Sequence, residues 1–384
     1  MIETGVAAGQ RVSAEIFVWS RLAIWAAAVF AYLAFEPNRH PEAGRWDTPR
    51  LHDLGYGLDV WARWDSAFFV RIADDGYDRA SAAFFPLYPA LVGALGRALL
   101  GHYVLAGVVV SLAATFAAFG LLYALAERRL GDDGARRAVI YLALFPMTLF
   151  LSAVYSESLF LVLALAAFAS AERGRFLGAG LATGFAMLTK PFGIALLPAI
   201  AVFAWRAGDR RRALLSLLPA PALAALYPLL LWREVDDPWA FAHAQDVWHR
   251  ELSPVGPLGG IWNGIRVVAT GDAPAGAQPL HALAVNLEGL VALALFAGLT
   301  AVAWRRFGAP YGLFAALGLA LPLSVPSERW PLLSLPRFGL VLFPLFLALA
   351  WIGRSPRMHA AIVGLSALFL GVAITQWALW QWVS

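Results

Sequence analysis

Long apolar runs constrain this chain more than any other feature of its sequence. Each approaches or exceeds the ~20 residues that cross a bilayer as a helix. The runs cover residues 103–126, 136–154, 212–232, 281–304 and 358–382. Charged residues make up only 14% of the chain, against roughly 25% in soluble domains. A soluble fold does not need so many apolar runs, so the sequence predicts an all-α polytopic membrane protein.

Arginines in the short loops between these runs predict the topology, because cytoplasmic loops carry an excess of basic residues. The basic loops cover residues 128–137, 173–175, 206–212, 305–306 and 354–357. All of them fall on one side of the membrane if residues 86–100 form a helix at the outer interface instead of a span. We then expect about 11 transmembrane helices in one domain over residues 1–384.

This topology leaves two long loops outside the cytoplasm, at about 37–102 and 234–280. Arg11 and Arg21, beside the first helix, are expected on the cytoplasmic side. Tryptophans near the end of the last helix are expected to form an aromatic belt at the outer interface. These are Trp377, Trp380 and Trp382.

The segment 176–206 is interrupted by the only lysine of the chain, Lys190, and the proline that follows it. Proline removes a backbone donor, and irregular backbone at membrane depth survives only where protein or water covers it. The sequence favours two short helices that meet at a lined cavity. One tilted and kinked helix is the alternative.

The first external loop holds the most reactive pattern, RWDSAFFVRIADDGYD at 63–78. Apolar residues at 64, 68, 69 and 72 have helical spacing, which predicts an amphipathic helix with its aromatic face on the membrane surface. Asp65 lies beside that apolar stripe, where partial desolvation would make it a better proton acceptor. Alternatively, Asp65 only caps the helix.

Further acids follow at the end of this helix. Asp74 and Asp75 could hold a divalent cation, Mg²⁺ or Mn²⁺, through their oxygens. Acids in a solvated helix end that terminates at Gly76 are the simpler interpretation. No other cofactor is indicated. Tyr77 could cover a sugar or a prenyl chain, although interfacial tyrosines are common in membrane proteins.

Other polar groups lie at expected membrane edges. Glu157 is costly there unless it is paired or faces a cavity, although the N-terminus of its own helix could also satisfy it. Lys190 and Arg337 could bind a phosphate, or could simply extend toward the headgroups. In the second external loop, Gln245 and Trp248 share one helical face.

Several classes of activity are not supported by the sequence. There is no cysteine, hence no thiolate site. No glycine-rich nucleotide motif is present, and the arginines follow the loops of a membrane protein, so a nucleic-acid partner is not expected. A sugar donor would therefore be a membrane lipid phosphate.

The motifs RWDSAFFVRIADDGY, AFFPLYP, AVYSESLF, LTKPFG and SLPRFGLVLFPLFLALA, in this order, resemble the PIG-V mannosyltransferases. The resemblance implies a C-type glycosyltransferase bundle that takes mannose from a polyprenyl phosphate and inverts the anomeric carbon. It implies that Asp65 is the catalytic base and that Glu157, Lys190 and Arg337 contact the substrate. Lysine stands at position 190 where we expect arginine in many relatives.

We therefore expect an inverting glycosyltransferase in the cell membrane, with its active site on the extracytoplasmic side and a glycolipid, lipoglycan or protein hydroxyl as acceptor. A transporter or flippase of lipid-linked sugars is the alternative. The residues expected to contact substrate are Arg63, Trp64, Arg71, Tyr77, Glu157, Lys190, Gln245, Trp248 and Arg337.

Overall fold

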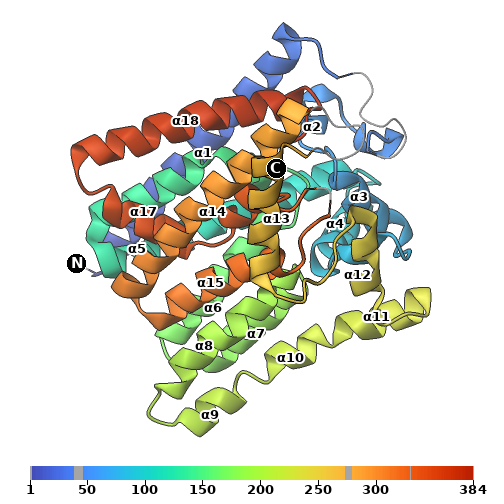
Figure 1. Cartoon of the computed structure of the whole chain (residues 1–384). Coiled ribbons are helices and arrows are strands. Elements are labelled where there is room, and N and C mark those ends of the chain that lie inside the picture. Colours follow the sequence, from blue (N-terminus) through green and yellow to red (C-terminus); the bar gives the residue numbers. More distant parts are fainter. Residues whose placement is uncertain (1, 39–45, 273–278, 329, 384) are drawn as a thin grey trace.

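A computed structural model describes residues 2–38, 46–272, 279–328 and 330–383. Within these ranges the secondary structure is helical, apart from one isolated bridge between Arg250 and Ser327. Figure 1 shows long helices running side by side through a single bundle. The chain is a multi-pass membrane protein, as its apolar runs predicted.

The α-helices are, in chain order, α1 (Ile2–Ala34), α2 (Tyr56–Asp59), α3 (Ser66–Asp75), α4 (Leu87–Ala98), α5 (Tyr103–Leu144), α6 (Glu157–Glu172), α7 (Phe176–Met187), α8 (Leu196–Trp205), α9 (Arg210–Leu215), α10 (Pro219–Ala224), α11 (Leu226–Val235), α12 (Ala240–His243), α13 (Pro257–Thr270), α14 (Pro279–Phe307), α15 (Ala309–Ser324), α16 (Leu335–Leu340), α17 (Pro344–Ile352) and α18 (Pro356–Ala378). The 3₁₀ helices are η1 (Pro49–Leu51), η2 (Ser81–Ala83), η3 (Pro146–Leu151), η4 (Pro191–Ala195) and η5 (Ala244–Trp248).

Five helical segments of the described chain are long and apolar enough to cross a membrane. They are Gly9–Ala34, Tyr103–Leu144, Arg210–Val235, Ala282–Phe307 and Pro356–Ala378. Three further apolar helices are shorter. The expected total of about 11 spans is therefore not confirmed, because several predicted spans are short or interrupted.

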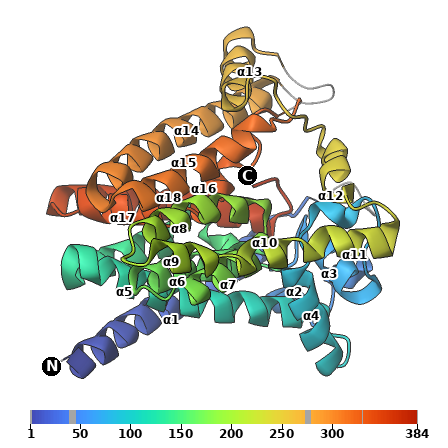
Figure 2. The same cartoon turned by 90° about the horizontal axis from the view of Figure 1, so that it is seen from below.

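The bundle has two distinct ends. In both views the N-terminus lies at one end, and the short helices α2, α3, α4, α11 and α12 gather at the other (Figures 1 and 2). Residues of the two predicted external loops therefore meet at one end of the protein. The cavity described below lies there.

The long helix α5 reverses direction at Gly131, whose φ of 71° lies in the left-handed region that glycine adopts without strain. The basic loop predicted at 128–137 lies at this turn. The apolar run predicted as a helix over 136–154 is helical only to Leu144, and η3 follows. Side chains of the first half of α5 compensate for the irregular backbone. Thr115 donates a hydrogen bond to the Leu151 carbonyl at 2.7 Å.

Arg21, expected on the cytoplasmic side, is buried within the bundle. The residue is only 7% exposed. The guanidinium donates hydrogen bonds to the carbonyls of Ala143 and Thr148, at 3.2 and 3.0 Å. Arg21 thus satisfies backbone oxygens where α5 gives way to η3.

The predicted break at Lys190 is confirmed. α7 ends at Met187, Lys190 is extended, and η4 begins at Pro191. A Cβ at Gly193 would lie 2.4 Å from backbone atoms of Met187, so only glycine allows this close approach. The break directs Lys190 toward α6 instead of continuing one kinked helix.

The helix predicted in the first external loop is α3, but its aromatic face does not rest on a membrane surface. Phe68 and Phe69 are 8% and 4% exposed. Phe69 packs edge-on against Tyr88 and Tyr155, with ring centroids 5.0 and 6.0 Å away. The hydrophobic spacing predicted the helix correctly. Its aromatic face, however, is covered by other parts of the protein.

The predicted aromatic belt is wrong for Trp377 and Trp380. They are 0% and 5% exposed, and the Trp377 indole donates a hydrogen bond to the Val60 carbonyl at 2.6 Å. The end of α18 and the segment after it fold onto the loop predicted at 37–102, which removes these rings from an interface with lipid.

Candidate active site

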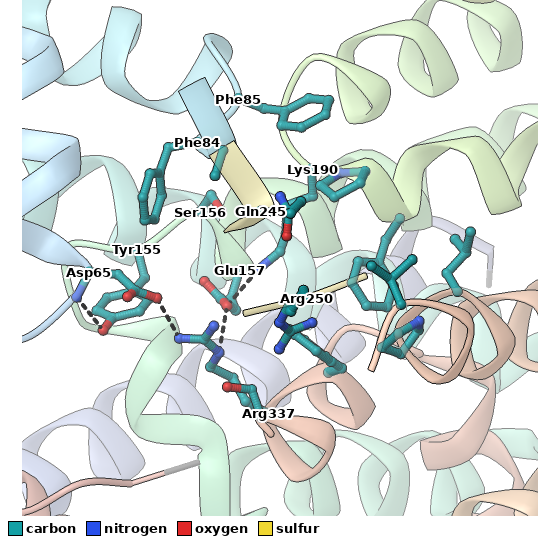
Figure 3. Close-up of a pocket in the computed structure, with 18 of the residues that line it drawn as sticks. Asp65, Phe84, Phe85, Tyr155, Ser156, Glu157, Lys190, Gln245, Arg250 and Arg337 are labelled. Atoms are coloured by element: carbon teal, nitrogen blue, oxygen red, sulfur yellow. Dashed lines mark hydrogen bonds and ion pairs between the residues drawn. The ribbon is translucent and has the colours of Figure 1, made fainter. Parts of the chain in front are cut away.

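A cavity of about 350 Å³ lies at the end of the bundle where the two predicted external loops meet. Its charged lining comes from segments far apart in the chain: the start of α3, the start of α6, the break before η4, the segment after η5, and α16. These side chains are Asp65, Glu157, Lys190, Arg250 and Arg337. Figure 3 shows them around one space.

Four of these side chains form a row of alternating charge (Figure 3). Arg337 lies 2.8 Å from the Asp65 carboxylate and 3.5 Å from Oε1 of Glu157. The same Glu157 oxygen lies 2.6 Å from Nζ of Lys190. Because the row is almost entirely buried, each charge depends on its neighbours to offset the loss of water.

Asp65 occupies the N-cap position of α3, yet its side chain makes no capping hydrogen bond. The capping alternative raised by the sequence is therefore not what the structure shows. Its backbone N–H instead donates to the Tyr155 hydroxyl at 3.1 Å, and that hydroxyl donates to the Arg63 carbonyl at 3.2 Å. Tyr155 thus fixes the backbone on both sides of Trp64 and turns the carboxylate toward Arg337.

Glu157 is the first residue of α6 and is 1% exposed. The helix N-terminus favours a carboxylate at this position. Its second oxygen, Oε2, is buried and has no hydrogen-bond partner among the described residues. Glu157 therefore has both a helical and an ionic role, which combines the two interpretations offered by the sequence.

Arg250 is the site residue that the sequence reasoning missed. Its guanidinium donates to the Leu333 carbonyl at 3.2 Å and lies over the Phe338 ring at 5.8 Å. No carboxylate in the described part of the chain pairs with it. Burial lowers the pKa of Arg250 to about 10, and Arg337 nearby acts in the same direction, so the side chain stays charged at neutral pH. Its position in the polar, aromatic loop predicted at 234–280 was the available signal.

The described lining therefore carries three basic groups against two acidic ones. The row from Asp65 to Lys190 is neutral overall, and Arg250 leaves one positive charge in excess. Such a cavity favours an anion. Aromatic and apolar side chains form much of the remaining wall, among them Phe84, Phe85, Phe192, Phe241 and Phe338.

The structure brings five of the predicted residues to this cavity: Asp65, Glu157, Lys190, Gln245 and Arg337. Others lie elsewhere. Arg63 and Trp64 are buried behind Asp65, at 2% and 9% exposure. Arg71 pairs with Asp78 on the surface, and Tyr77 donates to the Phe84 carbonyl at 2.7 Å. The side chain of Trp248 falls outside the described residues.

The two candidate metal ligands face a basic side chain. Arg50 lies 3.1 Å from the Asp74 carboxylate and 2.7 Å from that of Asp75. In the ranges that the structure covers, no group of three or more His, Cys, Asp or Glu residues has the arrangement of a metal site. The pair fits a surface ion pair better than a cation site.

We accordingly expect the double substitution Asp74→Asn with Asp75→Asn to change activity by less than about threefold, because surface ion pairs contribute little. Rates measured with and without added Mg²⁺ or Mn²⁺ provide the check. A large loss that excess metal restores would instead identify these acids as ligands.

Known proteins share both sequence and fold with this chain. Residues 55–207 match the model of the family described as Mannosyltransferase (PIG-V), which confirms the resemblance over that segment. GPI alpha-1,6-mannosyltransferase 2 of Homo sapiens is 34% identical over 160 residues, 37% of this chain and 32% of that protein. The Rattus norvegicus protein of the same name is 36% identical over 162 residues. The match thus spans about a third of these relatives.

One solved structure extends the likeness over nearly the whole chain. It is ArnT from Cupriavidus metallidurans bound to undecaprenyl phosphate, and it superposes with a TM-score of 0.52 at 17% identity. The match covers 92% of this chain and 62% of that one. The chain therefore shares the fold of ArnT.

Proposed function

We propose that this protein is an inverting membrane mannosyltransferase, because residues 55–207 match the family model described as Mannosyltransferase (PIG-V) and the chain shares the fold of ArnT. It transfers mannose from a polyprenyl-phosphate donor to a hydroxyl on a lipid or protein acceptor. The observation that carries the proposal is the Asp65–Arg337 pair at the edge of a cavity with excess positive charge.

Asp65 is the base in this mechanism. Its Oδ2 is held by Arg337, and its Oδ1 has no hydrogen bond within the described chain. The acceptor oxygen attacks the anomeric carbon as its proton passes to Asp65, and the bond from that carbon to the phosphate oxygen breaks. The electron pair of that bond leaves with the polyprenyl phosphate.

The charges of the cavity balance through this step. The donor is a phosphodiester with one negative charge, which Arg250 offsets. After transfer the phosphate carries two negative charges, while the protonated Asp65 no longer needs Arg337. Arg337 can then turn its positive charge to the leaving group, as stabilisation of developing charge requires. Lys190 stays with Glu157 and is the nearest additional cation.

The walls of the cavity suit a lipid-borne donor. Their aromatic side chains offer apolar surface to the first prenyl units and ring faces to a sugar. The undecaprenyl phosphate bound to ArnT supports a polyprenyl phosphate here. The basic loops lie toward the other end of the bundle (Figure 1), which supports an extracytoplasmic site in the cell membrane.

A transfer assay separates this function from transport. Purified protein would receive radiolabelled polyprenyl-phosphate mannose and membranes from cells that lack the protein as the source of acceptor. We expect label in a new glycosidic product. Label that crosses a vesicle membrane with no new bond would support a flippase instead and would refute the proposal.

Arg250 provides a sharper test of the donor site. A charged hydrogen bond contributes about 1.5–3 kcal/mol, so Arg250→Gln should raise the KM for donor by roughly 10- to 100-fold and lower kcat much less. Arg250→Lys keeps the charge and should restore part of the affinity. Arg71→Gln, at an exposed ion pair outside the cavity, is the matched control. An unchanged KM in Arg250→Gln would remove Arg250 from the phosphate site.

A further inference from the structure

The end of α18 and the residues that follow it, Trp377–Val383, are packed against the loop that carries Asp65. Trp377 is fully buried and donates to the Val60 carbonyl at 2.6 Å. Its ring lies edge-on to Tyr155, with centroids 5.7 Å apart. Tyr155 is the residue that holds the backbone of Asp65. The segment therefore touches the support of the base as well as the loop itself.

The loop contains a strained residue directly before Asp65. Trp64 has a φ of 51°, in the left-handed region that side-chain-bearing residues rarely adopt. Such a conformation is strained and persists only where surrounding contacts determine it. A relaxed Trp64 would turn the carboxylate of Asp65 away from Arg337.

Two tryptophans of the segment supply those contacts. The rings of Trp380 and Trp382 lie edge-on to Trp64, with centroids 5.6 and 5.2 Å away. The Arg63 guanidinium lies over the Trp380 ring at 4.2 Å. Trp380 thus contacts both residues that precede Asp65, while Trp382 also lines the cavity.

Arg63, which was expected to contact the substrate, is instead buried beneath the Trp380 ring. Its guanidinium donates to the Asp59 carbonyl at 3.0 Å and to the Ala62 carbonyl at 3.2 Å. The described chain offers it no carboxylate within ion-pair distance. A buried cation over an indole face is stabilised by the ring. Trp380, with its ring at 4.2 Å, therefore helps to hold Arg63 in place, together with these carbonyls and the Tyr56 ring at 5.9 Å.

We propose that Trp377–Val383 is a positioning element of the active site. Trp377 and Trp380 hold the strained turn at Trp64 so that Asp65 meets both Arg337 and the cavity, and Trp382 completes the wall beside it. Trp380 is a positioning residue, because it acts through Arg63 and Trp64. The role in catalysis rests on the proposed transferase function, whereas the role in holding the turn does not.

The kinetic test uses Trp380→Ala, Trp380→Phe and, as a control, Trp19→Ala at a ring that is 73% exposed on α1. A misplacement of about 1 Å at a reacting group can cost about 100-fold. We expect kcat to fall by roughly 10- to 100-fold in Trp380→Ala, with the KM for donor changed little. Phenylalanine keeps a ring face for Arg63 and should recover much of kcat.

A second readout does not depend on activity. Hydrogen exchange of the backbone amides at residues 60–69, measured by mass spectrometry on protein in nanodiscs, should speed up in Trp380→Ala and remain as in the wild type in Trp19→Ala. If Trp380→Ala does not accumulate, Trp380→Leu fills the same site with apolar atoms and lacks the ring face.

The outcomes separate the two ideas. If the wild-type protein transfers no mannose, and exchange at residues 60–69 is still faster in Trp380→Ala, the positioning element is retained and the transferase function is refuted. Unchanged exchange at 60–69 together with unchanged kcat would overturn the positioning element. The positioning element would also be overturned if kcat falls only in proportion to a loss of folded protein and falls by the same factor in Trp380→Phe.

Discussion

Asp65→Asn is expected to lower kcat by about 10²- to 10⁴-fold, the contribution of a general base. Asparagine has nearly the same shape as aspartate and can still accept a hydrogen bond from Arg337, but it cannot take the acceptor proton. The charges that bind the donor phosphate remain, so the affinity for donor should be kept. Donor binding and single-turnover transfer are the two measurements.

The matched control is Asp78→Asn, an acid of the same loop whose ion pair with Arg71 is exposed. This variant should behave as the wild type. Asp65→Ala should lose activity as fully as Asp65→Asn while remaining folded. Near-normal turnover in either Asp65 variant would show that another group accepts the proton.

Glu157→Ala is expected to reduce the stability of the folded protein by about 3–5 kcal/mol, as loss of one partner from a buried ion pair does. The Glu157 carboxylate is 1% exposed and serves two cations, Lys190 at 2.6 Å and Arg337 at 3.5 Å. Without it both positive charges lose a partner. The loss should appear as a lower temperature of thermal unfolding in detergent.

The double variant Glu157→Gln with Lys190→Met tests the physical reason. It removes one charge of each sign and leaves Arg337 with Asp65, so it should be clearly more stable than Glu157→Ala. Ser158→Ala, next to Glu157 in the same buried turn, is the control. Equal unfolding temperatures for Glu157→Ala and the wild type would mean that the row of charges is not a structural unit.

Three of the charged residues that line the cavity could be predicted from short sequence patterns. A charged side chain at membrane depth costs free energy unless it is paired or serves a function. This reasoning singled out the carboxylate among aromatic residues, Asp65, the acid at a helix start, Glu157, and the lysine before a proline, Lys190. The patterns could not give the pairing. That Arg337 links the two acids depends on the packing of α16 against η3 and α14.

Arg250 and Trp380 were harder to recognise for a related reason. An arginine in a polar loop is ordinarily solvated, and tryptophans at a helix end ordinarily lie at the membrane interface. Local sequence cannot distinguish these states from burial by a distant segment. Both residues owe their roles to contacts with parts of the chain remote in sequence, Leu333 for Arg250 and Arg63 for Trp380.

The apolar runs established the fold class but not the number of spans. Run length predicts a helix only where the backbone is regular, and η3 interrupts the helix expected over residues 136–154, whereas η4 lies at the break that the sequence predicted. Ser111, Thr115 and Arg21 satisfy the freed carbonyls near η3. Such compensation by side chains from other helices is invisible to hydropathy alone.

The stereochemistry of transfer tests the central claim most directly. With a β-linked polyprenyl-phosphate mannose as donor, a single displacement with Asp65 as base inverts the anomeric carbon. The account predicts an α-linked mannoside as the only new product, identified by its anomeric NMR signals and its cleavage by an α-mannosidase. A β-linked product would require two displacements and a second nucleophile, and would contradict the mechanism.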